Sequence, residues 1–272
     1  MSSPRQHPAR GSVGVVGCGW LGLELARDCL AAGYEVFGTT TTEAKLPELR
    51  ALGIQAEVLR LSPKPVFAKA ASEVPDAEAD FGAARVWAAD QLVLNVPPGR
   101  TDASRRVYPA QVLAAVLAYR RAQPAGRIVF CSSTSVYGEA RGTVTVETSL
   151  ADPSPRALCM ALAESQVRSQ SQRPHAILRL AGLYGGDRHP GKTLAGRRDL
   201  PGGDAPTNLA SRERVIARIR HYLDAPFWVT ALENVVDPDH PSKRDRYTAY
   251  ARAHGLVAPI FLPGGAEGKV VT

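Results

Sequence analysis

Cysteine is scarce in this sequence of 272 residues, and its four cysteines are scattered at positions 18, 29, 131 and 159. No two of them have the close spacing of a zinc centre or of a Cys-x-x-Cys redox motif. The pattern therefore argues against a metal site. It favours reduced, buried thiols, as in proteins of the cytoplasm.

Long apolar runs are also missing. No segment reaches the roughly 20 apolar residues that cross a bilayer, so we expect no membrane partner. Residues 1–10 are polar, contain Pro4 and Pro8, and lack the apolar core of a signal peptide. We therefore expect a disordered tail over residues 1–11 and a cytoplasmic location.

Positive charge is in excess, but it forms no obvious basic cluster. The 33 Lys and Arg residues outnumber the 26 Asp and Glu residues, which gives a formal net charge of +7. A nucleic-acid-binding protein would gather these charges on one face or helix, so we expect no nucleic-acid partner. A cleft that attracts phosphorylated ligands, or a solvated basic surface, explains the charge as well.

The most informative segment is residues 12–22, in which a short apolar run ends in Gly17-x-Gly19-x-x-Gly22. A helical pattern follows at once. Strand, tight turn and helix N-terminus in this order hold the pyrophosphate of a dinucleotide. Gly17 permits the turn, Gly19 lets the backbone approach the phosphates, and Gly22 lets the helix pack on the strand. A glycine-rich turn without a ligand is the structural alternative.

Apolar runs alternate with helical patterns through the first part of the chain, which is typical of a parallel sheet covered on both faces. Strands are predicted near residues 12–17, 35–38, 56–61, 91–96, 127–132 and 176–180, and long helices over residues 101–123 and 155–169. This predicts an α/β fold with a doubly wound parallel sheet, the Rossmann fold, as a dinucleotide-binding domain over residues 12–182.

The composition and periodicity of the sequence change after Gly182. Residues 187–208 are rich in Gly, Pro and Arg and show little periodicity, before helical patterns return near residues 215–223 and 246–253. Substrates bind beyond the carboxyl ends of the strands in such folds. We therefore expect residues 183–272 to form a small C-terminal substrate lobe that is integrated with the Rossmann core.

The end of the second predicted strand carries threonines instead of an acidic residue. NAD-specific sites usually place Asp or Glu here to bind the ribose 2′-hydroxyl, whereas this chain has Thr39 to Thr42, followed by Lys45. Hydroxyls and an ammonium group can bind a 2′-phosphate that no carboxylate repels. We therefore expect NADP as cofactor, with NAD as the alternative. A plain connection capped by Thr42 explains the threonines without a ligand.

A second distinctive segment, Cys-Ser-Ser-Thr-Ser-Val-Tyr-Gly at residues 131–138, ends the fifth predicted strand. With the glycine pattern, it resembles the atypical or extended short-chain dehydrogenases/reductases of the NAD-dependent epimerase/dehydratase kind. Residues 178–185, 234–237 and 268–271 carry the resemblance further. It implies that Ser133 is the catalytic hydroxyl that hydrogen-bonds the reacting oxygen. Hydroxyl residues that only terminate a strand are the alternative.

The glycine pattern, the strand ends and the resemblance together indicate the cofactor-binding residues. They are Gly17, Gly19, Trp20, Leu21, Gly22, Thr40, Thr41, Asn95, Val96, Pro97 and Ser132. The segment that starts at Asn95 is expected to close over the adenosine or the nicotinamide. Without a ligand it would only end a strand.

The resemblance fails where the family carries Tyr-x-x-x-Lys, the pair that moves the proton. Arg156 stands at the Tyr position and Met160 at the Lys position. Neither can do that work, because Arg is permanently protonated and Met carries no charge. Either another donor serves, with Tyr137, Tyr184, Ser133 acting through water, or a group on the substrate as the candidates, or the cofactor is bound without turnover. Both tyrosines have an alternative as aromatic packing residues.

We therefore expect an NAD(P)-dependent oxidoreductase or epimerase-like enzyme, whose small-molecule substrate is a polar carbonyl or alcohol, such as one derived from a nucleotide sugar. Arg188, Lys192 and Arg197 are candidates for binding a substrate phosphate, although solvated loop charges are at least as consistent with the pattern. The alternative function is a catalytically inactive NAD(P)-binding regulator or scaffold. Analogy with the family suggests a homodimer through the helices over residues 101–123 and 155–169.

Overall fold

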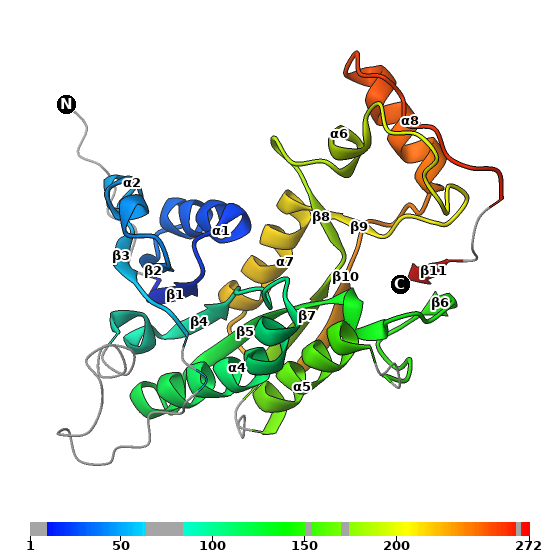
Figure 1. The fold of residues 1–272 in the computed structure, drawn as a ribbon. Helices are drawn as coiled ribbons and strands as arrows, with labels where there is room; N and C mark the ends of the chain where they lie inside the picture. Colours follow the sequence, from blue (N-terminus) through cyan, green and yellow to red (C-terminus); the bar gives the residue numbers. More distant parts are fainter. Residues whose placement is uncertain (1–9, 62, 64–83, 151–153, 170–173, 265–267) are drawn as a thin grey trace. The chain divides into compact units, whose positions relative to one another are not determined.

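The computed structural model describes residues 10–61, 63, 84–150, 154–169, 174–264 and 268–272 (Figure 1). The chain divides into two compact units that alternate along the sequence. Unit 1 comprises Met1–Cys131, Cys159–Ile177 and Ile219–Ala231, and unit 2 comprises Ser132–Leu158, Leu178–Arg218 and Leu232–Thr272. The domain boundaries predicted after residues 11 and 182 stay predictions. Residues 1–9 of the predicted tail lie outside the described residues.

A seven-stranded sheet is the central element. Its strands are β1 (Ser12–Val16), β2 (Glu35–Thr40), β3 (Gln55–Val58), β4 (Gln91–Leu94), β5 (Arg127–Ser133), β7 (His175–Leu180) and β10 (Ala231–Val235). They follow the order β10-β7-β5-β4-β1-β2-β3. The pairs β1–β2, β1–β4, β2–β3 and β4–β5 are all parallel. This sheet and its connecting helices confirm the predicted Rossmann-like α/β fold.

The principal helices along the chain begin and end for local chemical reasons. They are α1 (Trp20–Ala31), α2 (Leu46–Ala51), α4 (Asp102–Ala122), α5 (Pro155–Ser169) and α7 (Arg212–Asp224). Helix α4 starts after Thr101, whose hydroxyl oxygen accepts a hydrogen bond from the Ser104 N–H at 3.2 Å, as an N-cap does. Helix α5 begins with Pro155, because proline lacks the N–H that would have no partner inside the helix.

Unit 2 also contains short elements that the sequence pattern did not predict. They are β6 (Gly142–Val144), β8 (Gly182–Tyr184), α6 (Pro190–Leu194), β9 (Leu209–Ser211) and β11 (Lys269–Val271). Strand β11 pairs in parallel with β6, and β8 pairs in parallel with β9. Helix α8 (Lys243–Ala253), which packs against α6 (Figure 1), starts three residues before the predicted helix, because the Ser242 hydroxyl oxygen accepts the Asp245 N–H at 3.0 Å.

The central strands are buried on both faces. Val13, Val15, Leu92, Val93 and Phe130 all have a relative exposure of 0%. Near-continuous apolar runs of this kind are expected where helices cover both sides of a parallel sheet. The strand predicted over residues 91–96 is shorter than expected and ends at position 94. In the part of the chain that the structure describes, no helix is long and apolar enough to cross a membrane.

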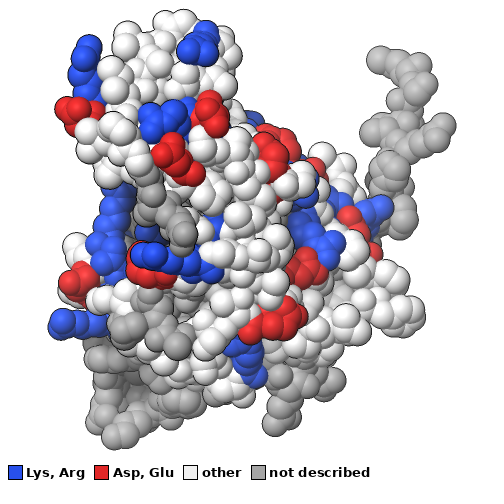
Figure 2. All heavy atoms as spheres, turned by 90° about the vertical axis from the view of Figure 1, so that its right-hand side faces the viewer, with Lys and Arg blue, Asp and Glu red and all other residues white. Residues whose placement is uncertain are grey.

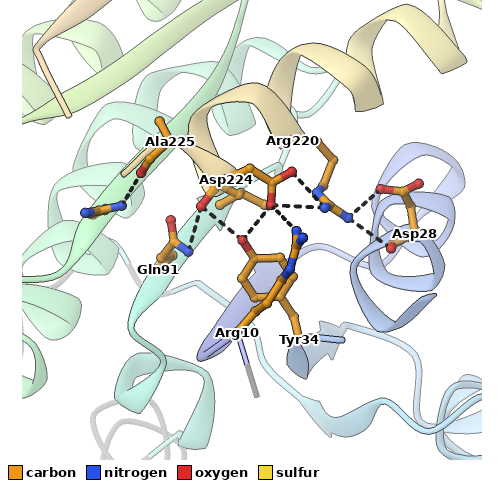
Figure 3. Close-up of polar contacts among 9 residues, drawn as sticks. Arg10, Asp28, Tyr34, Gln91, Arg220, Asp224 and Ala225 are labelled. Carbon is orange, nitrogen blue, oxygen red and sulfur yellow. Dashed lines mark hydrogen bonds and ion pairs between the residues drawn. The ribbon is translucent and has the colours of Figure 1, made fainter. Parts of the chain in front are cut away.

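The C-terminal end of α7 is held by side chains at or just before the start of three strands (Figure 3). The carbonyl oxygen of Leu223 lies 3.0 Å from the Tyr34 hydroxyl and accepts a hydrogen bond from Gln91 Nε2 at 3.1 Å. Arg127 donates to the carbonyl oxygen of Ala225 at 2.9 Å. The last carbonyl groups of a helix have no partner within it. Side chains at the strand ends therefore supply hydrogen-bond donors for the carbonyl groups at this end of α7.

Asp224 is the acidic centre of the same cluster. Its carboxylate accepts hydrogen bonds from Arg220 at 2.8 and 3.1 Å and from Arg10 at 3.0 Å. Burial alone would raise the pKa of Asp224. The hydrogen bonds from Arg220 and Tyr34 and the charges of Arg220 and Arg10 outweigh burial, so the pKa is lowered. The folded chain therefore favours the ionised carboxylate.

We predict that Asp224→Asn lowers the free energy of unfolding at pH 7 by about 1 kcal/mol, a value kept small because water screens the partly exposed ion pairs. Folding lowers the pKa of Asp224, so the carboxylate stabilises the folded chain fully above its unfolded pKa of about 4. This contribution is lost as the pH falls toward the folded pKa. Urea unfolding at pH 7 and pH 3 measures both values.

The difference between the native chain and Asp224→Asn should therefore be larger at pH 7 than at pH 3. Asp187→Asn is the matched control, because Asp187 is exposed and has no ion pair among the described residues. A difference of the same size at both pH values would contradict the assigned role of Asp224.

Candidate functional site

The glycine turn after β1 contains contacts that leave room only for hydrogen atoms. Gly17 has a φ of +99°, which favours glycine, and a Cβ there would lie 2.5 Å from the carbonyl oxygen of Asn95. A Cβ on Gly22 would lie 2.1 Å from the carbonyl oxygen of Gly17. These contacts require glycine at both positions.

Thr39 holds this turn from the neighbouring strand β2. Its hydroxyl oxygen accepts the Gly17 N–H at 3.0 Å, and its carbonyl oxygen accepts the Cys18 N–H at 2.7 Å. The Asn95 carboxamide donates to the carbonyl oxygen of Gly17 at 3.3 Å. Thr39 was predicted as one of the hydroxyl residues near a 2′-phosphate, and its contact with the glycine turn was not predicted. The parallel register that pairs Val15 with the residue before Thr39 brings it to the turn.

Gly19 differs from the other two glycines because it borders open space. A Cβ added to Gly19 would meet no atom within 4 Å. Gly19 is the N-cap of α1, and no acidic side chain lies in the first turn of that helix. The N–H groups of the first turn, from Trp20 to Gly22, have no acceptor within the helix. Open space at the positive end of a helix fits a pyrophosphate, and the buried side chain of Leu21 leaves only its main chain for that contact.

The end of β2 combines hydroxyl groups with a guanidinium group. The Thr40 hydroxyl oxygen accepts the Thr42 N–H at 3.2 Å, and Arg60 donates to the carbonyl oxygen of Thr41 at 3.0 Å. Thr41 and Arg60 are both exposed. Arg60, which follows β3, carries no local sequence signal for this place. The pairing of β3 with β2 brings it beside the threonines.

The segment after β4 is tied to the fold through its main chain. The carbonyl oxygen of Val96 accepts the Tyr108 hydroxyl at 2.7 Å, and the Asn95 N–H donates to Val16 at 3.0 Å. Pro97 is exposed. These contacts fix the segment beside the glycine turn of unit 1, whereas its predicted role in covering a cofactor stays a prediction.

Strand β5 ends in the hydroxyl residues predicted for the site. Ser133 is half-buried, and its Oγ accepts the Ser135 N–H at 3.1 Å. Among the described residues, no acceptor is found for the Ser133 O–H. Ser132 is buried, and burial raises the pKa of the neighbouring Cys131 thiol to about 12, so that thiol is not a nucleophile at neutral pH. Because the Ser133 O–H has no acceptor among the described residues, its proton is available to a ligand.

Tyr137 belongs to a buried polar chain within unit 2. Its hydroxyl accepts a hydrogen bond from Arg179 Nη1 at 2.9 Å and donates one to Asn234 Oδ1 at 2.7 Å. Arg179 is 1% exposed, and its guanidinium carbon lies 5.0 Å from the centre of the Tyr137 ring. Proton donation by Tyr137 stays a prediction, and it would require the hydroxyl to leave Asn234.

Tyr184 belongs to a different polar group of unit 2. Its hydroxyl donates to Asp237 Oδ2 at 2.7 Å, and the other carboxylate oxygen lies 3.1 Å from Arg214 Nε. Burial, followed by the hydrogen bond to Asp237 and its negative charge, raises the pKa of Tyr184, although Arg246 opposes this. Tyr184 therefore stays protonated at neutral pH. Within the described residues no hydrogen bond joins it to Tyr137 or Ser133.

The predicted substrate-binding residues Arg188, Lys192 and Arg197 are all exposed. The main chain of Arg188 exchanges two hydrogen bonds with Gly185, at 2.8 and 3.0 Å, and the Arg197 carbonyl oxygen accepts the Ile260 N–H at 2.9 Å. These contacts fix the backbone of the loop and assign no ligand to its charges. The substrate role of the three residues stays a prediction.

Helix α5 carries Arg156 and Met160, which stand at the positions predicted for the Tyr and Lys of the family. Arg156 is exposed in the first turn, and Met160 is 2% exposed. One turn further on, the buried Glu164 pairs with Arg168 at 2.7 Å. Neither Arg156 nor Met160 can exchange a proton at neutral pH.

Charged side chains of both signs are interspersed on the face shown in Figure 2. This differs from the concentrated basic surface that nucleic-acid binding favours, and the partner predictions stay predictions. Within the ranges described, no three His, Cys, Asp or Glu side chains form a group that could hold a metal ion.

Comparison with known proteins adds the following likenesses. The model of the NAD-dependent epimerase/dehydratase family matches residues 13–198. Protein YeeZ of Escherichia coli K12 is 35% identical over 257 residues, which cover 94% of this chain and 89% of YeeZ.

Two solved structures are similar in fold. The UDP-glucuronic acid 4-epimerase from Bacillus cereus in complex with NAD has a TM-score of 0.69 at 17% identity, covering 96% of this chain and 87% of that one. The Bordetella bronchiseptica enzyme WbmH in complex with NAD+ has a TM-score of 0.72 at 14% identity, with 96% and 89% covered. At these identities the likeness shows the fold alone.

The two helix-side glycines should respond differently to the same substitution. Gly22→Ala should lower the free energy of unfolding by about 1–3 kcal/mol, because its methyl group overlaps the Gly17 carbonyl. Gly19→Ala, its matched control, should destabilise the chain less, because its methyl group enters open space and only the preference for glycine over alanine at the N-cap of α1 is lost. Calorimetry of both variants measures this. Equal destabilisation by the two would show that the turn is packed differently.

Proposed function

The chain belongs to the NAD-dependent epimerase/dehydratase family, and we propose that it uses NADP(H) to move a hydride to or from a small polar carbonyl or alcohol. Family membership supports a coarse NAD-dependent, epimerase-like role. The observation that carries the proposal is the glycine turn. Neighbouring carbonyl oxygens leave no room for a side chain at Gly17 or Gly22, whereas Gly19 borders open space. Such a turn receives a dinucleotide pyrophosphate at the first turn of α1.

The preference for NADP(H) rests on the chemistry at the end of β2. A 2′-phosphate carries negative charge, and Arg60 offers a guanidinium group that its bond to the Thr41 carbonyl already directs to this strand end. Thr40 and Thr41 add hydroxyl groups. No Asp or Glu stands at positions 39–42, where a carboxylate would repel the phosphate.

We predict that Arg60→Gln weakens NADPH binding by about tenfold and leaves NADH binding nearly unchanged, because the substitution removes a charge-assisted hydrogen bond to the 2′-phosphate. Fluorescence titration with each nucleotide measures both affinities. Arg121→Gln is the matched control, since Arg121 is an exposed arginine on α4. A native chain that binds NADH as tightly as NADPH would refute the preference, and the NAD alternative would then hold.

Ser133 is the residue that we propose to hold the reacting oxygen of the substrate. A bound nicotinamide supplies the hydride donor or acceptor. Ser133 Oγ is oriented by the Ser135 N–H, so its own proton can be donated to a carbonyl or alkoxide oxygen. A preorganised donor of this kind stabilises charge that develops on oxygen during hydride transfer.

We predict that Ser133→Ala lowers kcat by about 100-fold and leaves the Kd for NADPH unchanged, because one oxyanion donor is lost. The rate of NADPH oxidation with a panel of carbonyl compounds provides the measurement. Ser135→Ala is the matched control in the same segment, because it keeps the main-chain N–H that orients Ser133. Unchanged turnover in Ser133→Ala would remove Ser133 from the mechanism.

Uridine diphosphate sugars should be tested as alcohol substrates, with the reduction of NADP+ as the measured reaction. Structures similar in fold carry such substrates in their names. We propose that Lys192 on α6, with Arg188 before this helix and Arg197 after it, binds a substrate phosphate. Tyr137 and Tyr184 remain candidates for moving the proton. Each hydroxyl already donates a hydrogen bond to a side chain of this protein, so it would have to break that bond before it could donate its proton to a substrate.

A second candidate function follows from the groups available for proton transfer. Arg156 and Met160 replace the usual proton-transfer pair, and both tyrosine hydroxyls are engaged. A nicotinamide-binding regulator or scaffold without turnover would have this pattern. Tight NADPH binding, with no turnover of any carbonyl or alcohol in either direction, would favour this function over the enzyme.

We further propose a homodimer in the cytoplasm. Large apolar side chains are exposed on both predicted interface helices, with Val107 on α4 at 40%, and Leu158 and Leu162 on α5 at 49% and 44%. Exposed apolar residues of this kind are favourable dimer contacts. The four cysteines are free and buried, which suits a reducing compartment.

A further inference from the structure

Strand β11 is hydrogen-bonded on one side to strand β6 and on the other to the side chain of Asn208, all within unit 2. On one side, β11 pairs in parallel with β6, and the Thr272 N–H donates to the carbonyl oxygen of Val144 at 2.9 Å. Val271 and Val144 are buried, at 0% and 1% exposure. We call residues 268–272, with the side chains of Asn208 and Asn234 that bind them, the β11 clasp.

Asn208 takes the place of a second partner strand. Its carboxamide donates to the carbonyl oxygen of Lys269 at 2.8 Å, and its oxygen accepts the Val271 N–H at 2.8 Å. The polar groups of residues two apart in a strand point to the same side, so one carboxamide can bind both. Three residues of strand are too short to be stable alone. Asn208 therefore supplies main-chain bonding that β11 would otherwise lack.

The clasp in turn holds the far end of the segment that follows Ser133. Residues Thr134–Tyr137 form a short 3-10 helix, and Gly138 after it has a φ of +50°. The Lys269 ammonium group donates to the carbonyl oxygen of Gly138. Asn234 donates to the main-chain oxygen of Thr272 at 2.8 Å and accepts the Tyr137 hydroxyl at 2.7 Å.

The segment from Ser133 to Gly138 is thus fixed at both ends. At its start, Ser133 is the last residue of β5, and its Oγ accepts the Ser135 N–H. At its end, Lys269 binds Gly138, and Asn234 binds Tyr137. Loss of either end would let the 3-10 helix change its geometry, and with it the orientation of the Ser133 hydroxyl.

We propose that Asn208, Asn234 and Lys269 are positioning residues, which hold the Ser133–Gly138 segment so that the Ser133 O–H meets the reacting oxygen. This inference rests on the proposed function of Ser133. Catalysis by a fixed donor depends on the position of the donor atom to within a fraction of an ångström. The three residues act through the segment and do not touch the substrate themselves.

The test uses Lys269→Met and Asn208→Leu in the full chain, with hydrogen exchange of residues 134–138 and steady-state kinetics as readouts. We expect about tenfold faster exchange in this segment, and a kcat about tenfold lower, which corresponds to about 1.4 kcal/mol of transition-state stabilisation. The Kd for NADPH and the KM should change little. Lys269→Arg should restore kcat, because it keeps a donor for Gly138.

Lys243→Met is the matched control, since Lys243 lies on α8 and its side chain has no hydrogen bond or ion pair among the described residues. Asn234→Asp keeps the acceptor for Tyr137 but loses the donor to Thr272. It should therefore show a partial effect, and it provides a milder variant should the others fail to fold.

Unchanged exchange of residues 134–138 in all three variants would overturn the clasp. Faster exchange with unchanged kcat would overturn its role in positioning Ser133. A native chain that binds NADPH but turns over no substrate refutes the proposed function instead. In that case the exchange measurement still decides whether the clasp holds the segment.

Discussion

The close approach of α1 to β1 is the constraint on which the cofactor end of this protein depends. Only a hydrogen atom fits between Gly22 and the Gly17 carbonyl oxygen, because a Cβ there would come within 2.1 Å. This contact sets where the first turn of α1 begins, and so where its N–H groups point. Thr39 and Asn95 bind the same turn from the neighbouring strands. The open space at Gly19 is a consequence of this packing.

The candidate catalytic residues of unit 2 differ in whether their hydroxyl proton is already donated to an acceptor within the protein. The protons of Tyr137 and Tyr184 are donated to Asn234 and Asp237, and a buried donor gives up such a bond only at a cost of about 1–3 kcal/mol. Ser133 accepts a main-chain N–H and keeps its own proton for a ligand. This contrast is the physical reason to base the proposed chemistry on Ser133.

The predicted replacement of the usual proton-transfer pair by Arg156 and Met160 would change what the proposed site can do. Arg156 is a permanent cation, and Met160 is a buried apolar residue of α5. In the proposed site Ser133 polarises the oxygen, and a second group is needed to exchange the proton, for which Tyr137 and Tyr184 are the candidates. The source of that proton is therefore the chemical question that separates a slow or substrate-assisted enzyme from a cofactor-binding regulator.

Local patterns in the sequence determined the Rossmann-like fold, the glycine turn and the range of α5, because spacing of glycines and apolar residues acts within a few positions along the chain. The contacts that Thr39, Arg60 and Asn208 make carry no such signal. Strand register brings Thr39 to Gly17, and Arg60 to Thr41. Packing in unit 2 joins Asn208 to β11, 61 residues away. Only the tertiary structure decides these contacts, because a hydrogen bond between distant residues depends on geometry that no local pattern encodes.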